Sequence, residues 1–228
     1  MEQKYRHEYK YPVTIAQINM LTQRLDCLIP RDSHVNQNGM YNIRSIYFDD
    51  FYNRCFYENE NGTDPREKFR IRIYNNSDEH ISLECKRKER GKTYKTSCPI
   101  TKEQCNLIMS GGVPTDFTNQ KPLLNKLALE MLNNQMRPVI IVDYDRIPYV
   151  YDSGNVRITF DMNVSSSTQI ANFFDKDIAK RAVMPQGQHL MEVKWDEYLP
   201  EFIHDALSLA NLQYTAYSKY YLYRLYNL

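Results

Sequence analysis

Basic side chains occupy every second position of one short segment, Arg66-Glu67-Lys68-Phe69-Arg70-Ile71-Arg72. Such residues share one face only if the segment is a β-strand, because strand side chains point to opposite faces in turn. Like charges along one face repel each other, so the face needs an oppositely charged partner or ligand. The segment therefore predicts a strand whose cationic face meets something negative.

Charged residues share a strand face in four further segments. They are Glu8 and Lys10; Glu84, Lys86 and Lys88; Arg157, Thr159 and Asp161; and Glu192 and Lys194. On a single strand, a solvated outer face is the simpler interpretation. Because five strands repeat the pattern, we favour faces that line a cavity for a phosphate chain, since Arg and Lys both bind phosphate oxygens. The carboxylates would then hold Mg²⁺ or Mn²⁺.

The overall charge hides this local excess of cations. The 228-residue chain has 29 basic and 28 acidic residues, a net charge of +1. Residues 66–95 have ten basic and five acidic side chains (+5), which leaves 19 basic against 23 acidic (−4) elsewhere. This balance argues against a nucleic-acid coat protein, and the sequence has no Gly-rich phosphate loop.

Other sequence features predict the compartment. Five cysteines without a C-x-x-C pair favour a reducing compartment, so we expect a cytoplasmic location. The N-terminus is too charged for a signal peptide, and no apolar run is long enough to span a membrane.

Periodicity predicts an α+β fold in one domain, residues 1–228, built on a large antiparallel barrel or sheet. Capping boxes at Thr14/Gln17 and Thr101/Gln104 predict two helix starts, and 49–51 predicts a short helix or turn. Residues 165–186 show no clear period. The expected strands are 4–12, 43–48, 67–75, 80–88, 92–98, 138–151, 156–163 and 189–195. The expected helices are 14–28, 101–111, 122–135, 199–210 and the tail from residue 218.

The charged segments and their neighbours resemble the vacuolar transporter chaperone (VTC) domain, the polyphosphate polymerase branch of the CYTH-like triphosphate tunnel metalloenzymes. The matching pieces, in order, are RHEYKY (6–11), SIYFD (45–49), REKFRIR (66–72), LECK (83–86), DYDR (143–146), VRITFD (156–161), LMEVK (190–194) and YSKY (217–220). They extend over nearly the whole chain. The resemblance implies an eight-stranded antiparallel β-barrel, the triphosphate tunnel fold, with flanking helices.

The resemblance also implies a set of site residues and a reaction. The catalytic set is Arg70, Arg72, Lys86 and Arg157. The substrate-binding set is Lys10, Lys95, Ser218 and Lys219, with Arg66 and Arg146 as further lining residues for which a surface cation is the alternative. Glu192, with Glu8, is the implied metal-binding set for Mn²⁺ or Mg²⁺. Ala216 stands where the polymerase branch has a further lysine.

Three functions remain open at this stage. The first is an ATP-binding phosphotransferase that moves the γ-phosphate of ATP, or of another nucleoside triphosphate, onto growing polyphosphate. The second is a metal-dependent triphosphatase of the same fold, and the third is a non-catalytic polyphosphate-binding module. We expect no nucleic-acid partner. Eukaryotic relatives work in membrane complexes, so a membrane partner protein is compatible with the resemblance.

Overall fold

The computed structural model describes residues 6–114, 121–208, 212–215 and 218–225, with the backbone alone for Lys219, Tyr223 and Leu225. The chain forms two compact units. Unit 1 is Met1–Asn42, Tyr144–Val164 and Met184–Tyr217; unit 2 is Ile43–Asp143, Ser165–Val183 and Ser218–Leu228. The assignment of residues 1–228 to one domain stays a prediction.

Nine strands and six α-helices make up the described part of the chain. The strands are β1 (His7–Thr14), β2 (Tyr41–Asp49), β3 (Arg66–Tyr74), β4 (Ser77–Glu89), β5 (Lys92–Pro99), β6 (Arg137–Tyr151), β7 (Val156–Ser167), β8 (Arg181–Ala182) and β9 (Gln188–Trp195). The α-helices are α1 (Ile15–Asp26), α2 (Arg54–Glu60), α3 (Lys102–Met109), α4 (Pro122–Asn134), α5 (Glu201–Leu207) and α6 (Lys219–Leu225). Two short 3-10 turns, η1 (Ser153–Asn155) and η2 (Ile170–Asn172), complete the elements. Within the described residues, no helix combines the length and apolar character needed to cross a membrane.

The strand order is β1-β9-β7-β6-β2-β3-β4-β5, and β8 pairs with β7. The ladders whose registers are resolved are all antiparallel. The eight long strands correspond to the eight expected ones, each within a few residues. The two-residue β8 lies in the polar segment for which periodicity made no prediction.

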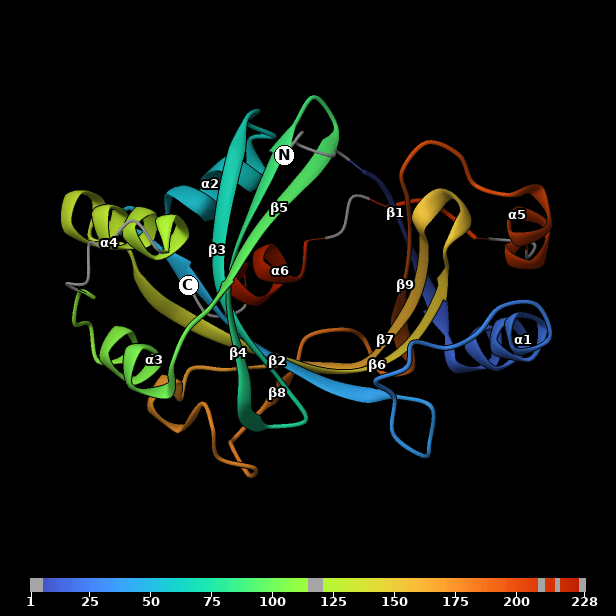
Figure 1. Ribbon diagram of the computed structural model, residues 1–228, viewed down its shortest axis with the longest axis horizontal. Coiled ribbons are helices and arrows are strands. Elements are labelled where there is room, and N and C mark those ends of the chain that lie inside the picture. Colours follow the sequence, from blue (N-terminus) through green and yellow to red (C-terminus); the bar gives the residue numbers. More distant parts are fainter. Residues whose placement is uncertain (1–5, 115–120, 209–211, 216–217, 226–228) are drawn as a thin grey trace. The chain divides into compact units, whose positions relative to one another are not determined.

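Unit 1 has a hydrophobic core between its strands and two helices. Both predicted capping boxes are confirmed, and the first starts α1, where the Thr14 hydroxyl accepts from the Gln17 amide at 3.3 Å. The apolar face of α1 is buried through Ile18, Leu21 and Leu25, as its spacing predicts. The helix contacts β1 and α5 (Figure 1). Helix α5 starts at Glu201 and ends at Leu207, so it is shorter than the predicted helix 199–210.

Two tight hairpins set the registers of unit 2. Asn75 and Asn76 connect β3 to β4 with φ of 51° and 54°, and Arg90 and Gly91 connect β4 to β5 with φ of 51° and 76°. Left-handed residues in two-residue connections match the twist of antiparallel strands. The three strands lie side by side, and α3 and α4 contact them (Figure 1). The register that follows aligns the charged side chains of the three strands.

A buried arginine holds the polar segment of unit 2 in place. Arg44 is fully buried on β2, and its Nε donates to Asp143 at 2.7 Å. Its Nη1 donates to the carbonyls of Phe173 at 2.9 Å and Asp175 at 2.5 Å. The segment therefore depends on one long-range cation, which explains why local periodicity did not predict its structure.

A buried carboxylate at the end of β2 organises two helices of unit 2. Asp49 accepts hydrogen bonds from the amides of Cys55 at 2.8 Å and Phe56 at 3.2 Å, the first turn of α2. It also accepts from the Tyr220 hydroxyl on α6. Of the two alternatives predicted for 49–51, a short helix or a turn, the structure has the turn: β2 ends at Asp49, a turn follows, and α2 starts at Arg54.

We expect Tyr220→Phe to weaken the attachment of α6 and to lower the free energy of unfolding by about 1.5–3 kcal/mol, the contribution of a hydrogen bond to a charged group. Urea unfolding measures the loss, and limited proteolysis reports cleavage near the C-terminus. Tyr221→Phe is the matched control, because the Tyr221 ring stacks on Phe56 and survives the change. Equal behaviour of the two variants would contradict the role given to the Tyr220 hydroxyl.

Candidate phosphate-binding site

Strands β3, β4 and β5 of unit 2 present one face rich in cations. The hairpin register pairs Lys68 with Lys86 and Lys86 with Lys95, so three lysines lie in a row across the strands. Seven cations and one carboxylate share this face, a net charge of +6. They are Arg66, Lys68, Arg70, Arg72, Lys86, Lys88 and Lys95, with Glu84. Because directly opposed like charges are destabilising, this face is suited to an anion.

The two ends of the lysine row turn toward different partners. Lys68 Nζ donates to Asn59 at 3.0 Å and to the Ser218 hydroxyl at 3.4 Å. It also lies 4.8 Å from the centre of the Tyr220 ring. Lys95 Nζ instead donates to Glu84 at 3.1 Å. Lys86 lies between them on β4 and is partly buried.

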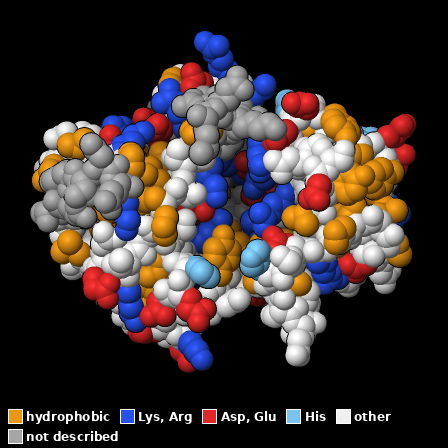
Figure 2. Space-filling view, in the orientation of Figure 1, with side chains coloured by type: hydrophobic (Ala, Val, Ile, Leu, Met, Phe, Trp, Pro, Cys, Tyr) orange, Lys and Arg blue, Asp and Glu red, His pale blue; other side chains and the backbone are white. Residues whose placement is uncertain are grey.

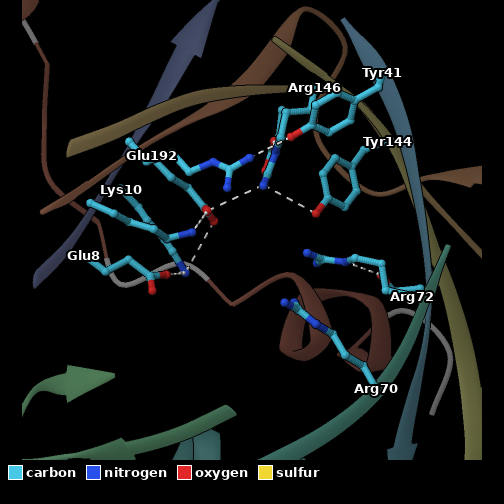
Figure 3. Close-up of polar contacts among 12 residues, drawn as sticks. Glu8, Lys10, Tyr41, Arg70, Arg72, Tyr144, Arg146 and Glu192 are labelled. Carbon is cyan, nitrogen blue, oxygen red and sulfur yellow. Dashed lines mark hydrogen bonds and ion pairs between the residues drawn. The ribbon is translucent and has the colours of Figure 1, made fainter. Parts of the chain in front are cut away.

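Glu84 is the centre of the hydrogen-bond network on this face. Arg70 donates to it from Nε at 2.6 Å and from Nη2 at 2.5 Å, and Arg72 Nη1 lies 3.9 Å away. Two residues of β2 steady the guanidinium groups: Tyr47 accepts from Arg70 at 3.1 Å, and Ser45 accepts from Arg72 at 3.2 Å. The side chains of Arg70 and Arg72 project beside one another (Figure 3).

The environment of Glu84 keeps its carboxylate ionised. Burial alone raises its pKa, but the charges of Arg70, Arg72 and Lys95 outweigh burial and hold the pKa well below its usual range. The carboxylate therefore remains a fixed acceptor that orients both arginines at neutral pH.

Unit 1 has a second charged cluster, with a different composition. Lys10 Nζ on β1 lies 2.9 Å from Glu8 and 3.7 Å from Glu192 on β9. Lys194 Nζ donates to the other Glu192 oxygen at 2.8 Å. The register pairs Lys10 with Glu192 directly across β1 and β9. Figure 3 shows Lys10 directed toward both carboxylates.

Arg146 joins this cluster from β6. It binds Asp161 of β7 with two hydrogen bonds of 2.6 and 2.8 Å, and its Nη2 lies 3.7 Å from Glu192. Burial opposes the charged form, but the Asp161 carboxylate outweighs it and raises the pKa of Arg146 above its usual value. Arg146 is therefore not a surface cation, since its side chain is only 7% exposed.

Arg157 is held apart from the acidic part of this cluster. Its Nη2 donates to Asp32 at 2.8 Å and to the Tyr41 hydroxyl at 2.9 Å. Burial raises the pKa of Asp32, but hydrogen bonds from His34 and the charge of Arg157 outweigh it and lower the pKa. Asp32 therefore positions Arg157, whose side chain remains 37% exposed.

The remaining predicted residues lie in unit 2. Arg66 donates to the Thr63 carbonyl at 2.7 Å, at the start of β3. The Ser218 hydroxyl accepts from the Tyr221 amide at 3.3 Å, in the first turn of α6. Lys219 is the first residue of α6, and its side chain lies outside the described residues, as does Ala216.

The carboxylates of unit 1 fit a metal ion that brings its own phosphate ligands. No group of three or more His, Cys, Asp and Glu side chains in the described ranges is arranged to hold a metal. Glu8 and Glu192 nevertheless share one cation, Lys10, and so both face the same point. Mg²⁺ is commonly bound by one or two carboxylates together with substrate phosphates. The pair is suited to that mode and not to an all-protein cage.

Away from these clusters, the surface carries mixed charges. Toward the edges of the visible face, Figure 2 shows basic and acidic side chains interspersed. Unit 1 also has an apolar cavity. The cavity, about 440 Å³, is lined by Tyr9, Tyr11, Met191, Val193, Trp195, Leu199, His204, Leu207, Ser208 and Leu212. None of the described residues that line it is Lys or Arg, so this lining is unsuited to phosphate.

Three carboxylates were missing from the predicted site. The alternating patterns placed Glu84 and Asp161 on charged faces as metal ligands, whereas in the structure they bind Arg70 and Arg146. Asp32 lies in a loop 125 residues from its partner Arg157, and nothing in its local sequence indicates the contact.

Two solved structures show the same fold. A candidate adenylate cyclase from Bacillus halodurans aligns with a TM-score of 0.53 and 14% identity, over 90% of this chain and 87% of that one. A candidate adenylyl cyclase from Hippeastrum, with a dominant triphosphatase activity, aligns with a TM-score of 0.56 and 11% identity, over 99% and 97%. A search of curated proteins found no match.

The predicted fold class is therefore confirmed: α+β, with the eight antiparallel strands of the triphosphate tunnel fold and flanking helices. The sequence profile of the VTC domain matches residues 5–224. The chain belongs to the VTC domain family.

We expect Glu84→Gln to lower the free energy of unfolding by about 3–5 kcal/mol near neutral pH, because it leaves buried cations without their carboxylate. The folded pKa of Glu84 is depressed. Its contribution is thus fully present above the unfolded value of about 4.3 and is lost as pH falls through the folded pKa. The difference between wild type and variant should shrink below about pH 4.3.

Urea unfolding at a series of pH values measures this difference. Glu89→Gln is the control, since Glu89 binds the half-exposed Arg87 at 3.0 Å on the same strand. A constant difference between wild type and Glu84→Gln across the acid range would show that Glu84 does not act through its charge.

Proposed function

We propose that this chain transfers the γ-phosphate of a nucleoside triphosphate, with ATP as the first candidate, to a growing polyphosphate chain. The observation that carries the proposal is the cationic face of β3–β5. From Arg66 to Arg72 this face extends over six residue steps, or about 20 Å at strand spacing. That run is longer than a triphosphate needs and is suited to a polymeric anion.

The residues of the chain would act by positioning and neutralising phosphate. Arg70 and Arg72 would bind equatorial phosphate oxygens with guanidinium groups that Glu84 already holds side by side. The row that includes Lys86 would hold the polyphosphate. An oxygen of the terminal polyphosphate group would attack the γ-phosphorus, the bond from that phosphorus to the β-phosphate oxygen would break, and nucleoside diphosphate would leave. Phosphoryl transfer of this kind needs no covalent protein intermediate.

A divalent ion, Mn²⁺ or Mg²⁺, would be held by Glu192 and Glu8 and would supply charge neutralisation to the phosphate oxygens. Lys10, Lys95 and Lys219 would bind the phosphates that flank the reacting group, with Ser218 beside Lys219. Arg157 would hold the triphosphate from its place next to Asp32. Arg146, which Asp161 binds on two atoms, would orient Glu192.

A triphosphatase is the second candidate, with water in place of polyphosphate as the acceptor. The likeness to the Hippeastrum protein, whose dominant activity is that of a triphosphatase, favours it. The third candidate is a polyphosphate-binding module without turnover.

Incubation of the pure protein with ATP and Mn²⁺ separates these candidates. Long polyphosphate is expected for the transferase. Monophosphate or free triphosphate as the product would instead indicate hydrolysis. Tight polyphosphate binding without turnover would indicate a binding module.

We expect Arg72→Ala and Glu192→Ala each to reduce turnover by about 100-fold or more, the scale of losing one electrostatic contact in phosphoryl or acyl transfer. Lys102→Ala is the control, because Lys102 pairs with Asp78 at 2.7 Å on the surface. The initial rate of ATP consumption is the measurement. If both site variants keep full activity, the assignment of this site is wrong.

A further inference from the structure

Lys10 occupies the position between two carboxylates that a metal ion would take. Its ammonium group lies 2.9 Å from Glu8 and 3.7 Å from Glu192, and the three side chains are only 16%, 11% and 6% exposed. A partly buried ammonium held by two carboxylates is a strong counter-ion, because the surroundings screen the attraction less than water does. Figure 3 shows this arrangement within unit 1.

Among the described ion pairs, the cluster around Glu192 has as many cations as carboxylates. Three carboxylates, Glu8, Glu192 and Asp161, face three cations, Lys10, Lys194 and Arg146, at separations from 2.6 to 3.7 Å. A divalent ion added to this set would bring two further positive charges. Its binding would be favoured if a cation left.

Lys10 is the cation that can leave most readily. Arg146 is fixed by two short bonds to Asp161. Lys194 forms a 2.8 Å ion pair with Glu192. Departure of Lys10 would release oxygens of both Glu8 and Glu192 at one point.

A buried hydroxyl beside the Glu8–Glu192 pair also indicates a bound ion or water. Thr159 is fully buried on β7, and its Oγ1 has no hydrogen-bond partner among the described residues. The register places Thr159 directly opposite Glu192, so the two side chains share one face. An unpaired buried hydroxyl is costly, and an ion or its water would satisfy it.

We propose that Lys10 is the resident counter-ion of the Glu8–Glu192 pair, and that a divalent cation binds there by displacing the Lys10 ammonium group onto a phosphate oxygen. The inference rests on the proposed function for the identity of the anion. Binding of the metal ion and binding of phosphate would then depend on each other. An anion that binds the Lys10 ammonium group raises the affinity for the metal ion, and the metal ion raises the affinity for the anion by the same factor.

The first test measures Mn²⁺ binding by the electron paramagnetic resonance signal of free Mn²⁺, without nucleotide. We expect Lys10→Met to bind Mn²⁺ about tenfold more tightly than wild type, the scale of one partly buried ion pair. Glu192→Gln in the Lys10→Met background should abolish the gain. Lys180→Met is the matched control, since Lys180 shares the carboxylate of Asp143 with an arginine in unit 2. Circular dichroism checks folding, and Lys10→Gln replaces Lys10→Met if that variant is unfolded.

The second test repeats the titration with inorganic phosphate present, after correction for its weak complex with Mn²⁺. Phosphate should raise the Mn²⁺ affinity of wild type and leave that of Lys10→Met unchanged. Equal phosphate effects in the two proteins, or a Lys10→Met affinity no higher than that of wild type, would overturn the inference. Neither test needs turnover, so an inactive protein can still show the competition, and an active one can still lack it.

Discussion

Electrostatic repulsion between side chains on neighbouring strands is the constraint on which the rest of unit 2 depends. The two hairpin turns fix a register that places Lys68, Lys86 and Lys95 in one row, and opposed residues in such a row are about 5 Å apart at their Cβ atoms. Glu84 is the single carboxylate of the face. It binds two arginines and one lysine at once, so the geometry of the cationic face depends on this one buried acid.

The two charged clusters differ in how their cations are matched by carboxylates. The cluster of unit 1 is balanced between carboxylates and cations, whereas the face of unit 2 has six more positive than negative charges. A balanced cluster can exchange one cation for another. An unbalanced face is suited to an anion from outside. The chain thus combines a cluster suited to cation exchange in unit 1 with a face suited to an anion in unit 2.

Most of the fold was predictable, because residue types alternate along several strands and the capping boxes mark helix starts. Register in unit 2 also follows from local sequence, since Asn75-Asn76 and Arg90-Gly91 are short turns. Partners distant in sequence could not be predicted. Asp32 binds Arg157 and Arg44 binds backbone carbonyls near residue 175, and both contacts depend on tertiary structure alone.

The lysine row has a practical consequence for handling the protein. Its charges lie closer together than the Debye length of about 8–10 Å at ordinary ionic strength, so simple salts screen them incompletely. A multivalent anion neutralises them far better. The protein should therefore retain cellular polyanions through purification, and its apparent stability in crude fractions would reflect the bound anion as much as the chain.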